Sequence, residues 1–242
     1  MAILRELIPY YVDIFDIEGF MNDPVLVIGV QDCIYYHYST KMKFKKLITQ
    51  RLNLYLQFLL RKSKFSGATY RRLREIPARF KCNNLQEVLK NYGMHSVKTM
   101  DLFDVRADFQ HDMNYVIPSN LKGQFNTVMD VGCIEHIFDT KQVLWNLFNL
   151  VKVNGHLLIC TACNGYYKHG FHTFSPECLL KAIELNGFSF KYVNFSTPDG
   201  IQIRDPKTVC DALIWIVARK DKHLEEFNIP QQGGWEILYR KG

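Results

Sequence analysis

The sequence predicts a doubly wound α/β fold, in which a mostly parallel sheet of seven strands carries helices on both faces. Short apolar runs alternate with segments of helical periodicity along the chain, and strands that alternate with helices of this length form parallel sheets. The length of 242 residues, of which 48% are hydrophobic, suits one α/β domain that folds without disulfide bonds.

The predicted strands are short apolar runs that end near glycine, asparagine or aspartate. They occupy residues 24–29, 97–100, 105–109, 125–131, 156–161, 188–195 and 212–218. The first run ends at Gly29, which predicts a buried parallel strand that enters a loop. The second ends at Asp101, and the turn Lys152–Gly155 precedes the fifth.

Helical periodicity marks four further segments. Three of them occupy residues 3–17, 84–91 and 140–151, the first with a break near Pro9. An asparagine caps the second of these helices and Gly93 stops it. The fourth begins at Ser175 and stops at Gly187, since serine at the cap and proline in the first turn are both favoured.

Lysines and arginines concentrate in residues 41–79, where twelve of them stand against a single acid. We expect residues 38–82 to form a basic helical insert or cap after the first strand, within one domain of residues 1–242. One interpretation is a cap whose Arg71 and Arg72 grip a phosphate of the substrate. An RNA-binding surface is the second, and a solvated helical face that also makes dimer contacts is the third.

Residues that directly follow the predicted strands are candidate site residues, because open parallel sheets bind ligands outside the carboxyl ends of their strands. Acids are the commonest type in this set, which comprises Gly29, Gln31, Asp32, Asp101, His111, Asp112, Met113, Asp130, Gly132, Glu135 and His136. A site for dinucleotide phosphates would need glycines and a free helix N-terminus instead. An adenosine cofactor with a sulfonium needs carboxylates for the ribose hydroxyls and the adenine amino group, so the pattern favours that ligand over NAD.

Four motifs in this order resemble those of class I methyltransferases, a Rossmann-like family. Residues 126–139, with Glu135-His136 before a helix, and residues 150–159 resemble the motifs that come after the cofactor loop. Residues 169–177 resemble the segment after strand five in small-molecule and glycan methyltransferases, and residues 108–113 resemble the strand-three motif whose acid reads adenine.

This resemblance spans roughly residues 24–36 and 95–220, and it implies S-adenosyl-L-methionine as the cofactor and S-adenosyl-L-homocysteine as its product. The implied cofactor contacts are Gly29, Gln31, Asp101, Leu102, Asp112, Met113, Asp130 and Gly132. The family's first loop carries an acid and three spaced glycines, whereas this loop has Gly29 alone. We expect a functional variant pocket in which the Gln31 amide hydrogen-bonds the cofactor carboxylate.

Glu135 and His136 stand where the resemblance places the methyl acceptor. We expect Glu135 to bind the acceptor and His136 to act as its general base; the alternative is a histidine packed inertly at a helix start. Quinone-type relatives hold a metal with a Glu-Glu-His cluster. This chain lacks the upstream glutamate, so no metal is expected.

The segment after the fifth strand supplies the remaining candidates. His169 and His172 flank Gly170 and could orient or deprotonate the acceptor, or they could simply be solvated. Tyr166 and Tyr167 could line the acceptor pocket or pack within a lid.

Cysteine content and the N-terminal residues indicate a cytoplasmic protein. The seven cysteines are an odd number spread along the chain, which fits reduced thiols better than disulfides. We expect a structural role for Cys160 and Cys163, since no second pair with zinc spacing exists. Residues 1–20 do not resemble a signal peptide, and no apolar run is long enough to span a membrane.

These observations predict a methyltransferase that acts on a small-molecule acceptor, as a monomer or homodimer. The expected acceptor atom is a hydroxyl or phosphate-type oxygen of a sugar, a nucleotide-linked compound or a phosphorylated metabolite. Positioning of the reactants would carry much of the catalysis. Two alternatives stay open: a nucleic-acid methyltransferase, suggested by the basic segment, and a catalytically silent binding module, suggested by the glycine-poor loop.

Overall fold

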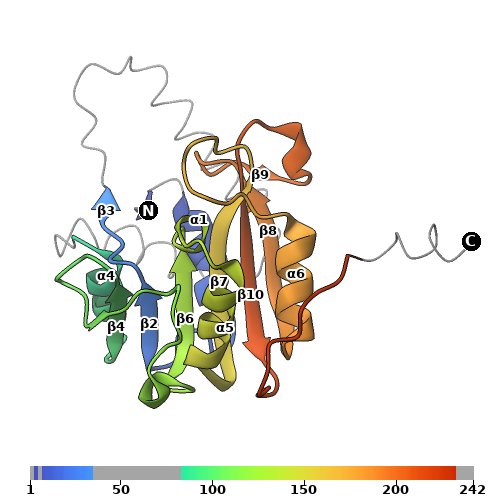
Figure 1. Ribbon diagram of the computed structural model, residues 1–242. Coiled ribbons are helices and arrows are strands. Elements are labelled where there is room, and N and C mark those ends of the chain that lie inside the picture. The colour runs from blue at the N-terminus through green and yellow to red at the C-terminus, as the bar shows by residue number, and fades with distance from the viewer. Residues whose placement is uncertain (1–2, 5–6, 35–82, 233–242) are drawn as a thin grey trace, which may run out of the picture.

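The computed structural model describes residues 3–4, 7–34 and 83–232, and an eight-stranded sheet forms its centre (Figure 1). The strands of this sheet are β2 (Val25–Ile28), β4 (Val97–Asp101), β5 (Phe109–Gln110), β6 (Phe125–Val131), β7 (Val151–Asn164), β8 (Phe188–Ser196), β9 (Gln202–Ile203) and β10 (Ala212–Lys220). Their order across the sheet is β5-β4-β2-β6-β7-β10-β8-β9.

Two further strands and seven helices complete the described elements. β1 (Ile3–Leu4) and β3 (Cys33–Ile34) pair in parallel as a separate two-stranded sheet. The helices are α1 (Ile8–Phe15), α4 (Leu85–Tyr92), α5 (Thr140–Leu150), α6 (Pro176–Leu185) and the short 3-10 turns η2 (Ser119–Leu121), η3 (Ile134–His136) and η4 (Pro206–Thr208). Within the described ranges, no helix is long and apolar enough to cross a membrane.

The first five strands of the sheet, β5-β4-β2-β6-β7, are parallel neighbours. Counted along the chain they stand in the order 3-2-1-4-5, which matches the first five strands of a doubly wound Rossmann sheet. β10 then lies antiparallel between β7 and β8, and β9 adds an eighth strand beside β8. The predicted α/β class is confirmed, while the predicted count of seven strands omitted the two-residue β9.

Both faces of the sheet are covered by helices, as predicted. On one face α5 and α6 pack against alternate strand residues, among them Leu26, Val128 and Ile214. On the other face α1 and α4 pack against the intervening residues, among them Val25 and Met129. Alternation within a strand sends successive side chains to opposite faces, so a continuous apolar run such as Val25–Ile28 is buried on both.

Helix boundaries agree well with local sequence signals. α4 begins after Asn84, whose side chain accepts a hydrogen bond from the backbone of Glu87, and ends at Gly93 with a positive φ of 121°. α5 begins after Asp139, which caps Gln142 in the same way. The predicted N-terminal helix is shorter than expected, because α1 begins at Ile8 and residues 3–4 form a strand.

The predicted strand at residues 105–109 is wrong, and the strand β5 occupies Phe109–Gln110 instead. The backbone turns at Asp104, where the N–H of Ala107 donates to its carbonyl and its carboxylate accepts from the backbone of Arg106. Aspartate bonds of this kind stabilise turns against extended structure. The predicted turn at residues 152–155 lies within β7 as an irregularity, with Asn154 at a φ of 67°.

Candidate functional site

The carboxyl ends of β2, β4, β6 and β7 meet at one edge of the sheet, and most of the predicted site residues lie there. Ile28 pairs with Met100 on one side and with Asp130 on the other. Gly29 and Asp101 therefore leave the sheet beside Asp130. This is the edge where open parallel sheets bind ligands.

The loop after β2 needs its one glycine because two side chains fold over it. Gly29 has a φ of 75°, and a Cβ there would lie 2.6 Å from Cys133 Sγ and 2.7 Å from Gln31 Nε2. The Gln31 amide nitrogen donates to the carbonyl of Ile28 at 3.1 Å. The Gln31 Oε1 is buried and has no hydrogen-bond partner among the described residues. The amide N–H groups thus face the protein, contrary to the predicted contact with a cofactor carboxylate, and the oxygen is the group left for a ligand.

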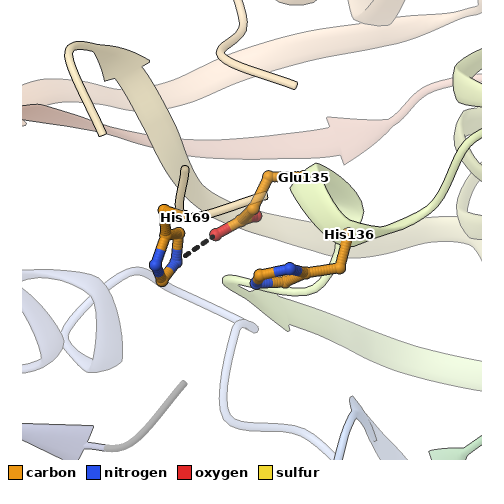
Figure 2. A group of neighbouring side chains, drawn as sticks. All are labelled: Glu135, His136 and His169. Atoms are coloured by element: carbon orange, nitrogen blue, oxygen red, sulfur yellow. Dashed lines mark ion pairs between the residues drawn. The ribbon is translucent and has the colours of Figure 1, made fainter. Parts of the chain in front are cut away.

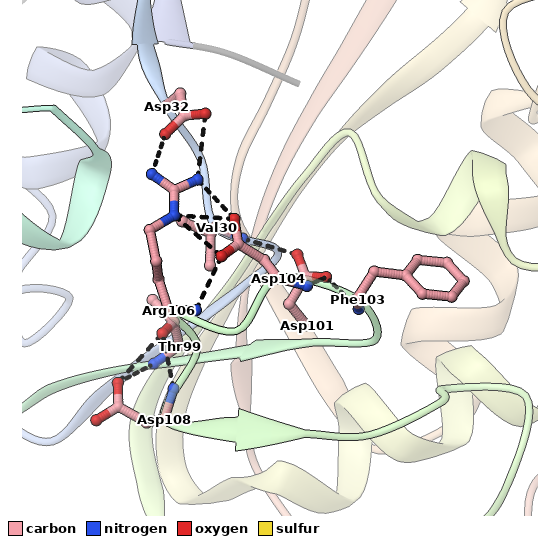
Figure 3. A network of polar contacts seen from close by, with 8 residues as sticks. All are labelled: Val30, Asp32, Thr99, Asp101, Phe103, Asp104, Arg106 and Asp108. Carbon is pink, nitrogen blue, oxygen red and sulfur yellow. Dashed lines mark hydrogen bonds and ion pairs between the residues drawn. The ribbon is translucent and has the colours of Figure 1, made fainter.

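Asp101 ties the loop after β2 to the loop after β4 (Figure 3). Its Oδ2 accepts from the backbone of Val30 at 3.0 Å, and its Oδ1 accepts from the backbones of Phe103 and Asp104 at 2.9 and 3.0 Å. Burial raises the pKa of Asp101, but these backbone hydrogen bonds outweigh it and hold the pKa below its ordinary value. A carboxylate offers about four lone pairs, so one on Oδ2 stays open to a ligand.

Arg106 forms a second connection between the same loops, and no pattern in the sequence predicted it. Its guanidinium pairs with Asp104 and, at 3.0 Å, with Asp32 (Figure 3). We name Asp32, Asp104 and Arg106 the arginine bridge. Hydrogen bonds from Arg106 lower the pKa of Asp104. About half of the Arg106 and Asp32 side-chain surface is exposed, and exposed ion pairs contribute little to stability.

Asp130 is fully buried at the end of β6, and only half of its carboxylate is hydrogen-bonded. Oδ1 accepts from the backbones of Cys133 and Ile134 at 3.1 and 3.4 Å. Oδ2 has no partner among the described residues. Burial, reinforced by the nearby charge of Glu135, raises the pKa of Asp130 to about 7.

Glu135, His136 and His169 form a group that we name the histidine cluster (Figure 2). Glu135 and His136 belong to η3 after β6, and His169 belongs to the loop after the neighbouring strand β7. The Nε2 of His169 lies 3.8 Å from Oε1 of Glu135, and the two imidazole rings are 5.0 Å apart. Glu135 is completely buried, whereas both histidines are exposed.

The loop that carries His169 is fastened to η3 by backbone contacts. The N–H groups of Phe171 and His172 donate to the carbonyl of Glu135 at 2.8 and 3.1 Å. A Cβ on Gly170 would lie 2.7 Å from that carbonyl oxygen, so only glycine fits there without a shift. Sequence patterns predicted no role for Gly170 itself, and its position between His169 and Phe171 was the only available signal.

The structure separates the other predicted acceptor residues into two groups. Tyr166, half-buried, has its ring 5.2 Å from the ring of His169 and belongs beside the cluster. His172 instead places Nε2 3.1 Å from the carbonyl of Phe138, and the Tyr167 side chain is 90% exposed.

Burial lowers the pKa of His136, although the charge of Glu135 opposes it. Its imidazole is therefore neutral at neutral pH and can accept a proton.

The remaining predicted cofactor residues have varied surroundings. The Oδ1 of Asp112 accepts two hydrogen bonds from Asn114, and the side chain of Met113 is part of the core rather than of a ligand surface. Gly132, at a φ of 80°, donates its N–H to the carbonyl of Cys160 in β7. Leu102 is 42% exposed. Arg71 and Arg72, which the sequence predicted as substrate-binding residues, lie outside the described residues.

Comparisons with known proteins give structural similarity but no match in sequence. No protein-family model and no curated protein matches the chain. A geranyl diphosphate methyltransferase solved in complex with SAM has a TM-score of 0.43 and 12% identity, covering 88% of this chain and 84% of that one. A Burkholderia thailandensis 1,6-didemethyltoxoflavin-N1-methyltransferase scores 0.39 at 12% identity, covering 80% and 95%. A Mesorhizobium loti S-adenosylmethionine-dependent methyltransferase scores 0.40 at 12% identity, covering 54% and 83%.

The strand order establishes the fold independently of these similarities. Apart from the small β9, the sheet runs 3-2-1-4-5-7-6 in chain order with its last strand, β10, antiparallel between the fifth and the sixth. This is the arrangement of the class I methyltransferase fold, which the sequence motifs predicted.

Proposed function

We propose that the protein is an S-adenosyl-L-methionine-dependent methyltransferase that acts on a small-molecule acceptor. The observation that carries the proposal is the excess of hydrogen-bond acceptors at the ends of β2, β4 and β6. Gln31 Oε1 and Asp130 Oδ2 are buried without partners among the described residues, and Asp101 Oδ2 has a lone pair to spare. Buried polar atoms of this kind need a donor, and this cofactor brings an ammonium and two ribose hydroxyls.

The residues present fit the two halves of this cofactor. Asp101 would accept a ribose hydroxyl, and the exposed side chains of Leu102 and Phe103 beside it offer an apolar surface to adenine. Gln31 Oε1 and Asp130 Oδ2 would accept from the ammonium of the amino-acid half. A dinucleotide would need N–H donors for its phosphates, whereas this loop presents acceptors.

The histidine cluster supports a role in preparing the acceptor. When bound, the cofactor supplies an electrophilic methyl group. His136, neutral and exposed, would take the proton of an acceptor hydroxyl at its free ring nitrogen. Tyr166 lies close enough to border the acceptor. The proposed methyl acceptor is a hydroxyl or phosphate-type oxygen of a sugar, a nucleotide-linked compound or a phosphorylated metabolite.

The glycine-poor loop favours a second candidate, a catalytically silent binding module. Gln31 and Cys133 occupy the space above Gly29, where additional glycines would leave the backbone open to a ligand. Calorimetric titration with S-adenosyl-L-homocysteine separates the two candidates, since a silent module that has lost the cofactor pocket binds none.

For the enzyme we expect micromolar binding of S-adenosyl-L-homocysteine, weakened at least tenfold in Asp101→Ala. Glu225→Ala removes an exposed acid beyond the opposite edge of the sheet and serves as the matched control. Absence of binding by the folded wild-type chain would refute the enzyme and favour the silent module. Binding that both variants weaken equally would contradict the assignment of Asp101.

A further inference from the structure

The strongest cluster of potential ligand atoms in the described part of the chain is the histidine cluster. Glu135, His136 and His169 each offer one ligand atom, and these atoms lie within 4.8 Å of one another. The sequence predicted no metal because the upstream glutamate of related clusters is missing. The structure supplies a different third ligand, His169, from the loop after β7, the strand beside β6.

We propose that Glu135, His136 and His169 bind a divalent transition-metal ion of the zinc type. Two imidazoles and one carboxylate are the ligand set of open three-ligand zinc sites. Magnesium and calcium prefer sets made of oxygen atoms. The inference concerns metal binding alone and does not rest on the methyltransferase proposal. Because a metal-bound neutral imidazole keeps no free nitrogen lone pair, His136 would act as the proposed base only in the metal-free chain.

A carboxylate oxygen without a hydrogen-bond partner among the described residues points into this site. Oε1 of Glu135 is completely buried and accepts no hydrogen bond from the described residues, while His169 Nε2 stands 3.8 Å away, beyond hydrogen-bond distance. A buried carboxylate oxygen without a donor or cation is costly. A metal ion between the carboxylate and the rings would satisfy it (Figure 2).

The spacing needs only a small adjustment to hold a metal. Ligand bonds of about 2.0–2.2 Å in a tetrahedral site place ligand atoms roughly 3.4 Å apart. The Glu135–His169 separation of 3.8 Å is close to this value. Both histidine side chains are exposed and can rotate toward the carboxylate, which leaves a fourth position open to water or another oxygen ligand.

Neighbouring groups orient the ligands before any metal arrives. The hydroxyl of Thr161 donates to Oε2 of Glu135 at 2.7 Å, which turns Oε1 toward the histidines. The backbone bonds from Phe171 and His172 to the carbonyl of Glu135 fix the His169 loop against η3. Such outer contacts orient the ligands of established metal sites.

Zinc titration of the chelator-treated, dialysed full chain tests the proposal. We expect one Zn²⁺ per chain with a dissociation constant in the micromolar range or tighter, and no binding of Mg²⁺ at the same concentration. His169→Ala removes an exposed ligand at little risk to folding and should weaken Zn²⁺ binding at least tenfold. Glu135→Gln keeps the acceptor for Thr161 and should weaken it to a similar degree.

The control is His223→Ala, which removes an exposed imidazole beyond the end of β10, at the opposite edge of the sheet. Its Zn²⁺ affinity should equal that of the wild type. The proposal is overturned if the wild-type chain binds no stoichiometric Zn²⁺, if His169→Ala binds as well as wild type, or if His223→Ala loses as much affinity as His169→Ala. Cofactor titration of the same samples reports separately on the methyltransferase proposal.

Discussion

The arginine bridge and the histidine cluster lie at the same edge of one sheet, yet their carboxylates are used in opposite ways. In the bridge, Asp104 pairs with Arg106, and both groups are accessible to solvent. In the cluster, Glu135 is completely buried and leaves one oxygen without a hydrogen-bond partner among the described residues, with His169 Nε2 3.8 Å away. An exposed carboxylate that is paired with an arginine stabilises a loop only modestly. A buried carboxylate oxygen without a hydrogen-bond donor is rare, and its presence calls for an explanation.

Asp130 is buried with one oxygen that lacks a hydrogen-bond partner among the described residues, so it resembles Glu135 of the histidine cluster rather than the arginine bridge. Its titration gives the largest expected effect on stability. Its pKa is raised from 3.8 to about 7, so between these values the folded protein holds a proton that the unfolded chain has lost. The free energy of unfolding therefore falls as the pH rises from about 4 to 7 and levels off above. A shift of three pK units sets a ceiling of about 4 kcal/mol.

Asp130→Asn tests this contribution because asparagine stays neutral and still accepts from Cys133 and Ile134. We expect the variant to gain stability relative to wild type as the pH rises, with most of the gain complete by pH 8. Urea unfolding of both proteins at pH 5, 6, 7 and 8 measures the difference, in which the other titrating groups cancel. Parallel pH curves would mean that Asp130 is not the source.

Gly170→Ala should have the next largest effect, because the added Cβ would lie 2.7 Å from the carbonyl oxygen of Glu135. Relief of such a contact moves the backbone, at a cost of about 1–3 kcal/mol in the free energy of unfolding. The move carries His169 away from Glu135, so Zn²⁺ affinity should fall as well.

Gly123→Ala is the comparison for that variant. A Cβ there meets nothing within 4 Å, although its φ of 65° is strained for alanine. Its stability should fall while Zn²⁺ affinity stays unchanged. If Gly170→Ala also leaves the affinity unchanged, the position of the loop does not control the cluster.

Arg106→Ala should have the smallest effect, since the bridge is exposed. We expect the melting temperature to fall much less than it does in Gly170→Ala. The difference from the wild-type melting temperature should shrink further in high salt. Differential scanning calorimetry at low and high salt measures both. A large salt-independent loss would show that the bridge is structurally as important as the buried cluster.

Local patterns in the sequence were sufficient for most elements of the fold. The apolar run at residues 125–131 became β6 without change, and α4 and α5 begin and end within a residue of their predicted limits. Burial on both faces makes such strands continuously apolar, and caps mark helix ends. The prediction of a strand at residues 105–109 was wrong because the carboxylate of Asp104 accepts from the backbone of Arg106 and stabilises a turn, and apolar patterning does not register such a bond.

The sequence by itself determined which residues follow the strands, and so it placed Asp101, Asp130 and Glu135 at the edge where the parallel strands have their carboxyl ends. Only the tertiary structure decided how each is used. The partners of a carboxylate depend on which loops the sheet brings together: β4 beside β2 gives Asp101 its backbone donors, and β7 beside β6 brings His169 to Glu135. Contacts between strands distant in sequence leave no local periodicity, because packing of the whole sheet creates them.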